Sequence, residues 1–169
     1  MSLDREFFLD SLAKSLQSCR SFHNYSITDL AERSGIHCNS ISAIENRNHD
    51  ASSITCAMLC FALNVQQIEL QKTGAIRLIP VPIQREQQKS TKIPQHAYII
   101  ERVGKAISHK REVCGLSQEK LAVSTGLHKN TIWSIERGLT VPINSNLFSI
   151  FYSLGVTLLK VDNFDIVLQ

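Results

Sequence analysis

Side chains that both donate and accept hydrogen bonds gather in the stretch LSQEKLAVSTGLHKNTIWSIERG, which runs from Leu116 to Gly138. A helix is predicted over about 128–136, with Ile132 and Ile135 on its inward face. Its outward face carries Lys129, Asn130, Thr131 and Ser134. Because asparagine can bond adenine through two hydrogen bonds and lysine suits guanine, this face has the chemistry to read base edges in a DNA major groove.

The neighbouring residues predict the elements that would position this face. Ser117 is the expected N-cap of a short helix that ends near residue 124, and Gly126 supplies a tight turn. Further helices are expected over about 98–113 and 145–154. Two short helices joined by a glycine turn, the second with a polar outer face, form a helix-turn-helix, whose second helix can enter the major groove.

An altered copy of the same stretch lies 91 residues earlier, as YSITDLAERSGIHCNSISAIENR from Tyr25 to Arg47. The two stretches align without a gap, and identical residues include the pairs Leu30 and Leu121, Gly35 and Gly126, Asn39 and Asn130, and Glu45 and Glu136. In this copy, helices are expected over about 6–21, 26–33, 37–45 and 53–63. We interpret the match as an internal duplication of one module.

Each set of helices is followed by two β-prone runs around a turn, VQQIELQ-KTG-AIRLIPV and VTLLKV-DN-FDIVLQ. The polar stretch QREQQKSTKIPQH, about 84–96, is the linker candidate. The expected fold is therefore mostly α, with two tandem four-to-five-helix modules that each end in a short β-hairpin. The expected boundaries are 1–80 for the first module, 81–96 for the linker and 97–169 for the second module.

The charge of the chain is unequally distributed. Residues 1–70 carry five Lys and Arg against eight Asp and Glu, whereas residues 71–169 carry thirteen against seven. The net charges of −3 and +6 indicate that a polyanion would bind mainly to the second half. The sequence has neither an apolar run long enough to span a bilayer nor a signal-peptide pattern, so we expect a cytoplasmic protein without a membrane partner.

Catalytic and metal-binding signals are missing from the sequence. The chain lacks a nucleophile elbow, a phosphate-binding loop and metal-ligand spacing, so we expect neither an enzyme nor a bound cofactor or metal. Its five cysteines include no CxxC pair and are interpreted as buried, reduced thiols. Cys38 is the exception, because its predicted position is on a helix surface.

The run GLSQEKLAVSTGLHKNTIWSIERG, followed by a proline and then LFSIFYSLGV, closely resembles the Cro/phage-repressor, or XRE, type of helix-turn-helix. The resemblance covers about residues 99–156 strongly and about 8–65 more weakly. It implies two repressor-like modules and a sequence-specific DNA-binding regulator of transcription, most simply a repressor. The implied partner is double-stranded DNA with a palindromic operator.

The resemblance also implies a role for each matching residue. Gln118 is expected to grip a phosphate and brace the recognition helix, and Arg137 to contact a phosphate. The base-reading face is expected to hold His128, Lys129, Asn130 and Ser134, with Thr131 and Trp133 beside it. Packing between the modules remains open for Trp133, as does helix capping for His128. Structural ion pairs are expected between Arg111 and Glu136 and between Arg20 and Glu45.

The first copy departs from the family pattern at the positions that would touch DNA. Ile27 replaces the phosphate-gripping Gln, Cys38 replaces Lys, and Asn46-Arg47 replaces Arg-Gly. A weaker DNA-binding set persists as His37, Asn39, Ser40 and Arg47. We therefore expect the N-terminal module mainly to support assembly or contact a partner.

Two alternatives remain open at this stage. The tail from Gly155 to Gln169 weakly resembles that of HipB-type antitoxins, in which a strand pairs across a dimer, and this raises an antitoxin role with a toxin as partner. A degenerate N-terminal module could also bind another regulator. The strands, in turn, allow either a homodimer or a pseudo-dimer formed within one chain.

Overall fold

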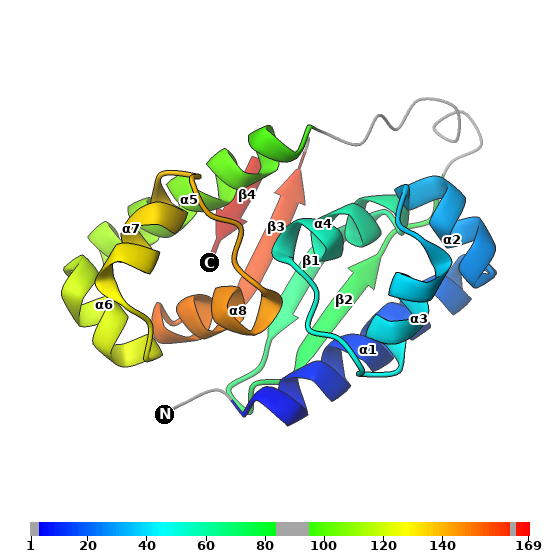
Figure 1. Cartoon of the computed structure of the whole chain (residues 1–169), viewed down its shortest axis with the longest axis horizontal. Coiled ribbons are helices and arrows are strands. Elements are labelled where there is room, and N and C mark those ends of the chain that lie inside the picture. Colours follow the sequence, from blue (N-terminus) through cyan, green and yellow to red (C-terminus); the bar gives the residue numbers. More distant parts are fainter. Residues whose placement is uncertain (1–3, 84–94, 163–164) are drawn as a thin grey trace.

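The structure, a computed structural model, describes residues 4–83, 95–162 and 165–169. Within these ranges the chain is mostly helical and carries a small antiparallel sheet (Figure 1). The elements follow in the order α1 (Arg5–Phe22), α2 (Ile27–Ser34), α3 (Cys38–Glu45), α4 (Ser53–Ala62), β1 (Val65–Leu70), β2 (Ile76–Pro80), α5 (His96–Val113), α6 (Gln118–Thr125), α7 (Lys129–Glu136), α8 (Asn144–Ser153), β3 (Leu158–Asp162) and β4 (Asp165–Leu168).

Local capping interactions explain where the short helices begin and end. Ser26 and Asp29 form a reciprocal capping box at the start of α2, and the Ser117 side chain accepts a hydrogen bond from Lys120 N at the start of α6. Gly126 ends α6 in the left-handed region, with φ of 71°. Each expected helix boundary lies within two residues of the observed one.

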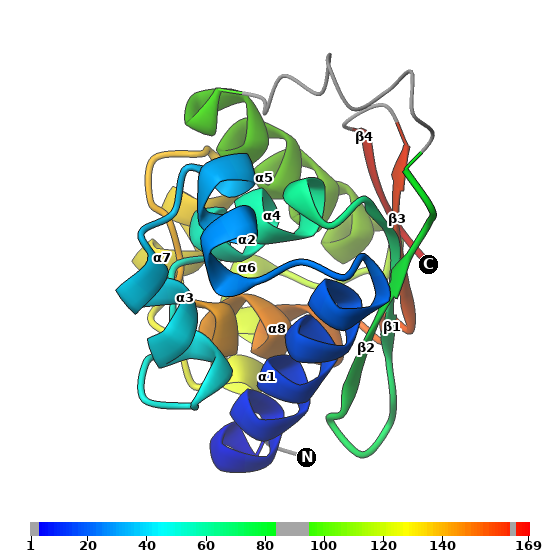
Figure 2. The ribbon, with the colours of Figure 1, turned by 90° about the vertical axis from the view of Figure 1, so that its right-hand side faces the viewer.

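Both expected hairpins form, and their strands join in one sheet with the order β2-β1-β3-β4. At its centre β1 pairs antiparallel with β3, and Ile68 lies opposite Leu159. The helices cover one face of this sheet (Figure 2). The two hairpins therefore pair within one chain. Residues 84–94 of the expected linker and Asn163 of the expected Asp162-Asn163 turn lie outside the described residues.

Contacts between the N-terminal and C-terminal halves are reciprocal. A shift of 91 residues relates Ala51 to Pro142 and Ser53 to Asn144. Ser53 N donates a hydrogen bond to Pro142 O at 2.9 Å, and Asn144 N donates one to Ala51 O at 3.0 Å. Ile68 and Leu159, the residues that lie opposite each other in the central strand pair, are likewise related by the shift of 91 residues. The contacts between the halves are thus reciprocal, as those between the subunits of an isologous dimer are.

The buried core is continuous across the two halves. It includes Leu12 and Leu59 from the first half and Ile107 and Phe151 from the second, all at most 2% exposed. Such a shared core holds the helices of both halves in fixed positions on the sheet, because burial of apolar surface is the main force that stabilises their contact.

Candidate nucleic-acid interface

The helix α7 begins at a histidine cap. His128 Nδ1 accepts a hydrogen bond from Asn130 N at 3.2 Å, so the ring satisfies a backbone donor at the helix start. The side chains of His128, Lys129 and Asn130 are all exposed. Of the two roles that the sequence left open for His128, the structure gives it helix capping, and its contact with DNA stays a prediction.

The pair α6 and α7 is held together by apolar side chains on its inner face. Leu121, Ile132 and Ile135 are at most 1% exposed. Their burial turns the opposite face of α7 toward solvent, although Thr131 and Ser134 are half-buried along its sides. The outward polar face that the sequence predicted for this helix is therefore formed chiefly by its first turn.

The end of α7 is fixed by a charged cluster. The Arg111 guanidinium donates two hydrogen bonds to the Glu136 carboxylate, at 2.6 and 3.0 Å, and Gln118 Nε2 donates a third at 2.8 Å. The side chains of Arg111 and Glu136 are 11% and 5% exposed. Their hydrogen bond raises the pKa of Arg111. The expected ion pair is thus present, and Gln118 braces α7 through Glu136.

Beyond this cluster lie an aromatic and a basic side chain that face solvent. The Arg137 guanidinium lies 4.8 Å from the centre of the Trp133 ring, in a cation–π contact. Trp133 is 40% exposed. It therefore stacks with Arg137 on the surface, while contact with DNA and packing between the modules both stay predictions for this residue.

Lys129 is paired within the chain. Its Nζ lies 2.6 Å from Glu119 Oε1 on α6, and both side chains are more than half exposed. The hydrogen bond from Lys129 lowers the pKa of the Glu119 carboxyl. This acid was missed by the sequence analysis, because the contact spans ten residues and depends on how the two helices cross. A base contact by Lys129 would have to replace this exposed ion pair.

The start of α3 repeats the geometry of α7. His37 Nδ1 accepts a hydrogen bond from Asn39 N at 3.2 Å, the same length as in the second copy. Asn39 and Ser40 are exposed, whereas Cys38 is half-buried instead of lying openly on the helix surface as expected. Amide and hydroxyl groups thus remain at this helix start, but the lysine found in the second copy does not.

The end of α3 is held differently from that of α7. The expected pair forms between Arg20 and Glu45, with two hydrogen bonds of 2.8 Å. Ile27 packs against the core at the position of Gln118. Arg47, a candidate for weak DNA binding, forms an ion pair with Asp10 at 2.7 Å. Asp10 was also missed by the sequence analysis, because it lies on α1, 37 residues from Arg47.

The cysteines follow the sequence-based expectation in part. All five are free, and Cys19, Cys56 and Cys60 are buried. Burial raises the pKa of the Cys19 thiol to about 11, so this thiol stays protonated at neutral pH. Cys114 is exposed, contrary to the expectation of burial, because it caps the C-terminus of α5 at the molecular surface.

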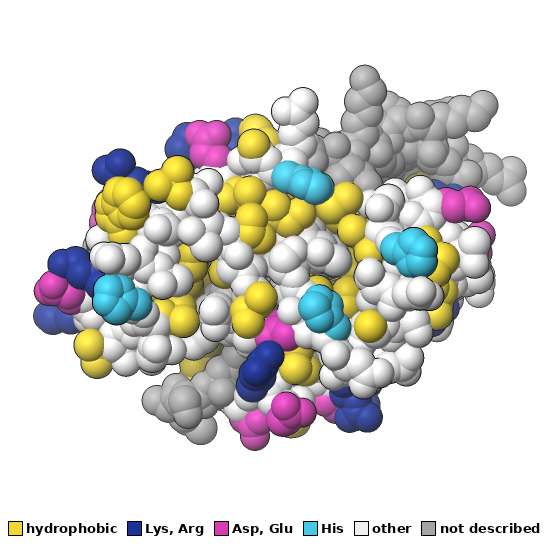
Figure 3. Space-filling model, in the orientation of Figure 1, with side chains coloured by type: hydrophobic (Ala, Val, Ile, Leu, Met, Phe, Trp, Pro, Cys, Tyr) yellow, Lys and Arg dark blue, Asp and Glu magenta, His cyan; other side chains and the backbone are white. Residues whose placement is uncertain are grey.

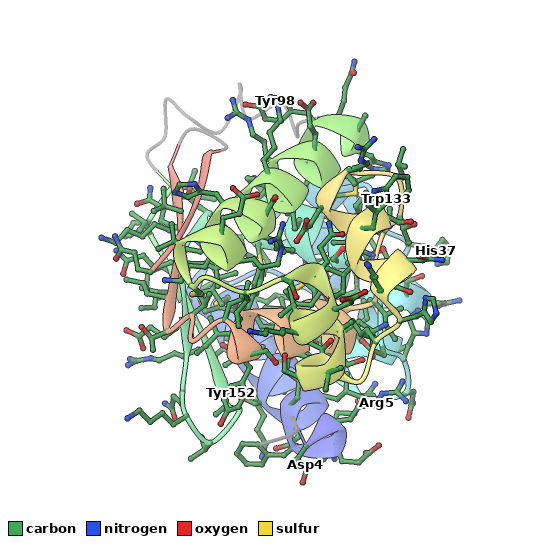
Figure 4. The ribbon with its side chains drawn as sticks, turned by 90° about the vertical axis from the view of Figure 1, so that its left-hand side faces the viewer. Asp4, Arg5, His37, Tyr98, Trp133 and Tyr152 are labelled. Atoms are coloured by element: carbon green, nitrogen blue, oxygen red, sulfur yellow. The ribbon has the colours of Figure 1, made fainter. Side chains whose placement is uncertain are left out.

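The helices α3 and α7 lie on the same face of the molecule. In Figure 4, His37 at the start of α3 and Trp133 of α7 are on the same side, away from the sheet. Figure 3 views this face directly: backbone and side chains that are neither hydrophobic nor charged cover much of it, hydrophobic side chains and histidines lie among them, and most of the Lys and Arg side chains lie toward its margins. The face can offer hydrogen bonds to two separate stretches of a partner.

Comparisons of the chain with protein-family models, with curated proteins and with solved structures find no match. Within the described ranges, no group of three or more His, Cys, Asp or Glu side chains is arranged to hold a metal ion. None of the helices described is both long and apolar enough to cross a bilayer.

Proposed function

We propose that this protein is a sequence-specific DNA-binding regulator of transcription, a repressor of the XRE type, that arose by tandem duplication of one helix-turn-helix module. The observation that carries the proposal is that α3 and α7 lie on the same face of the molecule. Both helices begin with a capping histidine and an exposed asparagine, and both lie on one face (Figure 4). In dimeric repressors, two such helices on one face enter successive major grooves on one side of a duplex.

The duplication is supported by interactions that recur at the same offset. Arg20 Nη1 donates to Tyr25 O at 2.9 Å, and Arg111 Nη1 donates to Leu116 O at 2.9 Å. Both of these positions are shifted by 91 residues between the copies, and so are the glutamate partners of the two arginines, Glu45 and Glu136. The equivalent arginine, its carbonyl partner and its glutamate partner are therefore retained together, which favours two copies of one structural unit over two unrelated sets of helices.

The intrachain sheet supports a pseudo-dimer as the DNA-binding unit. Repressors of this type read palindromic sites as symmetric dimers. Here the antiparallel β1–β3 pair and the reciprocal contacts before α4 and α8 relate the two helix pairs within one chain. One chain then presents both helix-turn-helix units on one face, and the two units need not contribute equally to DNA binding, since α3 and α7 differ in sequence.

Within this pseudo-dimer we assign base reading mainly to the C-terminal half. That half holds Lys129 and Asn130 at the start of α7 and Arg137 at its end, and residues 97–169 carry eight Lys and Arg against six Asp and Glu, a net charge of +2. In the N-terminal half, Arg47 forms an ion pair with Asp10, which also pairs with Lys14, and Ile27 offers no hydrogen bond to a phosphate. The N-terminal half accordingly serves chiefly to complete the two-fold assembly.

Selection of bound sites from random double-stranded DNA tests the proposal. We expect the purified full chain to enrich one sequence, and the Asn130→Ala variant to enrich a sequence that is less restricted at one or two positions. Enrichment of no sequence by the folded wild-type chain would reject sequence-specific DNA binding.

Two substitutions separate base reading from backbone contact. Asn130→Ala should weaken binding to the selected site by about 1–3 kcal/mol and leave binding to random DNA nearly unchanged. Arg137→Ala should weaken binding to both and reduce the slope of log affinity against log salt by about one unit. Equal losses on both DNAs for Asn130→Ala would remove this residue from the reading set.

A further inference from the structure

The helix α4 carries two cysteines one turn apart, where α8 carries two larger apolar side chains. The shift of 91 residues relates Cys56 to Leu147 and Cys60 to Phe151. Both cysteines are free thiols, and each keeps 6% of its surface accessible. Residues four apart lie on one face of a helix with about 5–6 Å between their Cβ atoms, so the two sulfurs can bind one atom together.

A pocket of about 70 Å³ lies beside these thiols. Both cysteines line it, and its walls come from α4 and β1 of the first half and from α5, α8 and β3 of the second. The helices α4 and α5 lie side by side (Figure 1). Ala57 on α4 and Val103 on α5 line the pocket and are half-buried, so a small molecule can enter between these helices.

Small side chains on α4 leave this space open. Ala57 is equivalent to Phe148, whose ring centre lies 5.1 Å from that of Phe8 and 5.5 Å from that of Phe151. The positions 56, 57 and 60 of α4 thus all correspond to larger side chains in α8. On its first-half side, the pocket is bounded by two thiols and a methyl group where α8 is filled by its own side chains.

The pocket favours an occupant without charge. None of the described side chains that line it is charged, and its accessible surface is almost entirely apolar. A hydrogen bond with Cys56 and burial raise the pKa of Cys60 well above its usual range, so Cys60 is a protonated thiol at neutral pH. An ion that kept a net charge between the two sulfurs would lose its hydration without compensation.

The two thiols also limit the number of bonds that the protein can supply. Within the described ranges, no third His, Cys, Asp or Glu joins Cys56 and Cys60 in a group that could hold a metal ion. Structural zinc sites are almost always four-coordinate, so this pair does not suit zinc. An arsenic(III) centre with one alkyl group has two exchangeable hydroxyl groups, which match two thiols, and its alkyl group matches an apolar pocket.

We propose that Cys56 and Cys60 together bind a monoalkyl arsenic(III) compound, with methylarsonous acid as the simplest example, and that the pocket holds its alkyl group. At each thiol, the S–H and As–OH bonds break, an As–S bond forms, and the thiol proton leaves with the hydroxyl group as water. Arsenic stays trivalent, and the product, with one carbon and two sulfurs on arsenic, is neutral. The pyramidal bonds of arsenic keep the two sulfurs on one side, as two positions on one helix face do.

The test uses the full chain with Cys38→Ser and Cys114→Ser, because these two thiols lie outside the core. A phosphine keeps the remaining cysteines reduced without adding thiols. We expect methylarsonous acid to bind in equimolar amount, and the intact mass of the complex to show that two water molecules have left. NMR of isotope-labelled methyl groups should show saturable shifts for Ile99 and Val103, which line the pocket.

Two further probes separate the thiols from the pocket. Dimethylarsinous acid has one exchangeable hydroxyl group and cannot join both thiols. It should bind at least about tenfold more weakly, because the second bond of methylarsonous acid forms within the complex at a high effective concentration. Arsenite would turn a hydroxyl group toward the apolar walls and should also bind more weakly. Equal affinity for dimethylarsinous acid, or the loss of only one water molecule, would overturn the proposal.

Substitutions locate the site. Cys56→Ser and Cys60→Ser should each lower the affinity for methylarsonous acid at least about tenfold. Ala57→Leu fills the pocket and should lower the affinity as well. Cys19→Ala is the matched control, because it removes a third buried thiol that does not line the pocket, and it should leave the affinity unchanged.

Circular dichroism shows which variants fold, and Cys60→Ala and Ala57→Val take the place of any that do not. A folded Cys60→Ser variant that keeps full affinity, or a folded Cys19→Ala variant that loses it, would contradict the assignment to this pair. Because DNA is absent from all these measurements, a failure of this site leaves the DNA-binding proposal standing, and the reverse holds as well.

Discussion

The ends of α3 and α7 occupy equivalent positions, yet they are held by different sets of partners. Glu45 accepts two hydrogen bonds from Arg20, and Gln17 bonds only its backbone carbonyl. Glu136 accepts two hydrogen bonds from Arg111 and a third from Gln118. The arginine–glutamate pair that ties the first helix to the third is common to both halves, whereas the additional support differs.

Between equivalent positions of the two halves, the solvent-facing side chains differ more than the buried side chains that hold the helices together. Arg137 stacks on the exposed Trp133, while Arg47 forms an ion pair with Asp10. Inward residues such as Ile41 and Ile132 keep both their type and their burial. The two halves therefore have the same order of helices and strands but different side chains on their surfaces. This difference is the physical basis for assigning DNA reading to one half and assembly to the other.

The largest expected effect comes from breaking the ion pairs. Glu136→Ala should lower the free energy of unfolding by about 3–5 kcal/mol, because it strands a buried guanidinium. The loss of unfolding free energy for Glu45→Ala should lie at the lower end of the same range. The carboxylate of Glu45 accepts hydrogen bonds from one side chain, whereas that of Glu136 accepts them from two. Urea denaturation of each full-length variant measures both losses.

The exposed pair of Glu119 with Lys129 supplies the control for this experiment. Glu119→Ala should cost at most about 1 kcal/mol, because exposed ion pairs contribute little. A loss for Glu136→Ala as small as that of the control would show that the pair does not stabilise the end of α7. A larger loss for Glu45→Ala than for Glu136→Ala would reverse the comparison.

A smaller effect is expected where the first helix of each half crosses the third. A Cβ added to Gly104 would lie 2.5 Å from Ile135 O and 2.7 Å from Glu136 O. Gly104→Ala should therefore destabilise the chain by about 1–3 kcal/mol. This is opposite in sign to the usual gain of about 0.5–1 kcal/mol for alanine over glycine within a helix.

The equivalent position in the first half is the matched control. Ala13 is tolerated there although it is only 2% exposed, so its backbone environment differs from that of Gly104. Ala13→Gly should cost about 1 kcal/mol from helix propensity alone. Thermal or urea unfolding of the Gly104→Ala and Ala13→Gly variants measures the two changes in stability. A Gly104→Ala variant that is more stable than the wild-type chain would contradict the close approach of α5 to α7.

Sequence patterns predicted most of the fold because its helices carry local signals. The capping residues Ser26 and Ser117 and the turn glycine Gly126 lie where the helices begin and end. The Arg111–Glu136 pair was predictable because both members recur at the same offset. In contrast, the choice between pairing within one chain and pairing between chains depends on the long-range β1–β3 contact, which no local pattern specifies.

The candidate site was predictable in its residue types but not in their partners. His128 and Asn130 are exposed at the start of α7 as expected. The acids that pair with Lys129 and Arg47 arise from the crossing of separate helices, so spacing along the chain gave no signal for them. The pocket beside Cys56 and Cys60 likewise becomes visible only once α5 and α8 are packed against α4.

The smallest expected effect on stability accompanies a gain in DNA affinity. Glu119→Gln removes the carboxylate that pairs with Lys129, so Lys129 becomes available to a phosphate or base. Stability should change by less than about 0.5 kcal/mol, whereas binding to DNA of any sequence should strengthen and its salt slope should steepen by about one unit. Weaker binding at low salt would show that Glu119 positions Lys129 for DNA. The comparable release of Arg47 by Asp10→Asn should have little effect on DNA binding.

The central claim, that the C-terminal half reads DNA while the N-terminal half completes the assembly, is tested most directly by footprinting on the selected operator. The Lys129→Ala, Asn130→Ala double variant should abolish protection, and the Asn39→Ala, Ser40→Ala double variant should leave the whole footprint nearly unchanged. Circular dichroism of both variants checks that they are folded. Loss of one half of the footprint in the second variant would contradict the account, because it would show that α3 also reads a half-site.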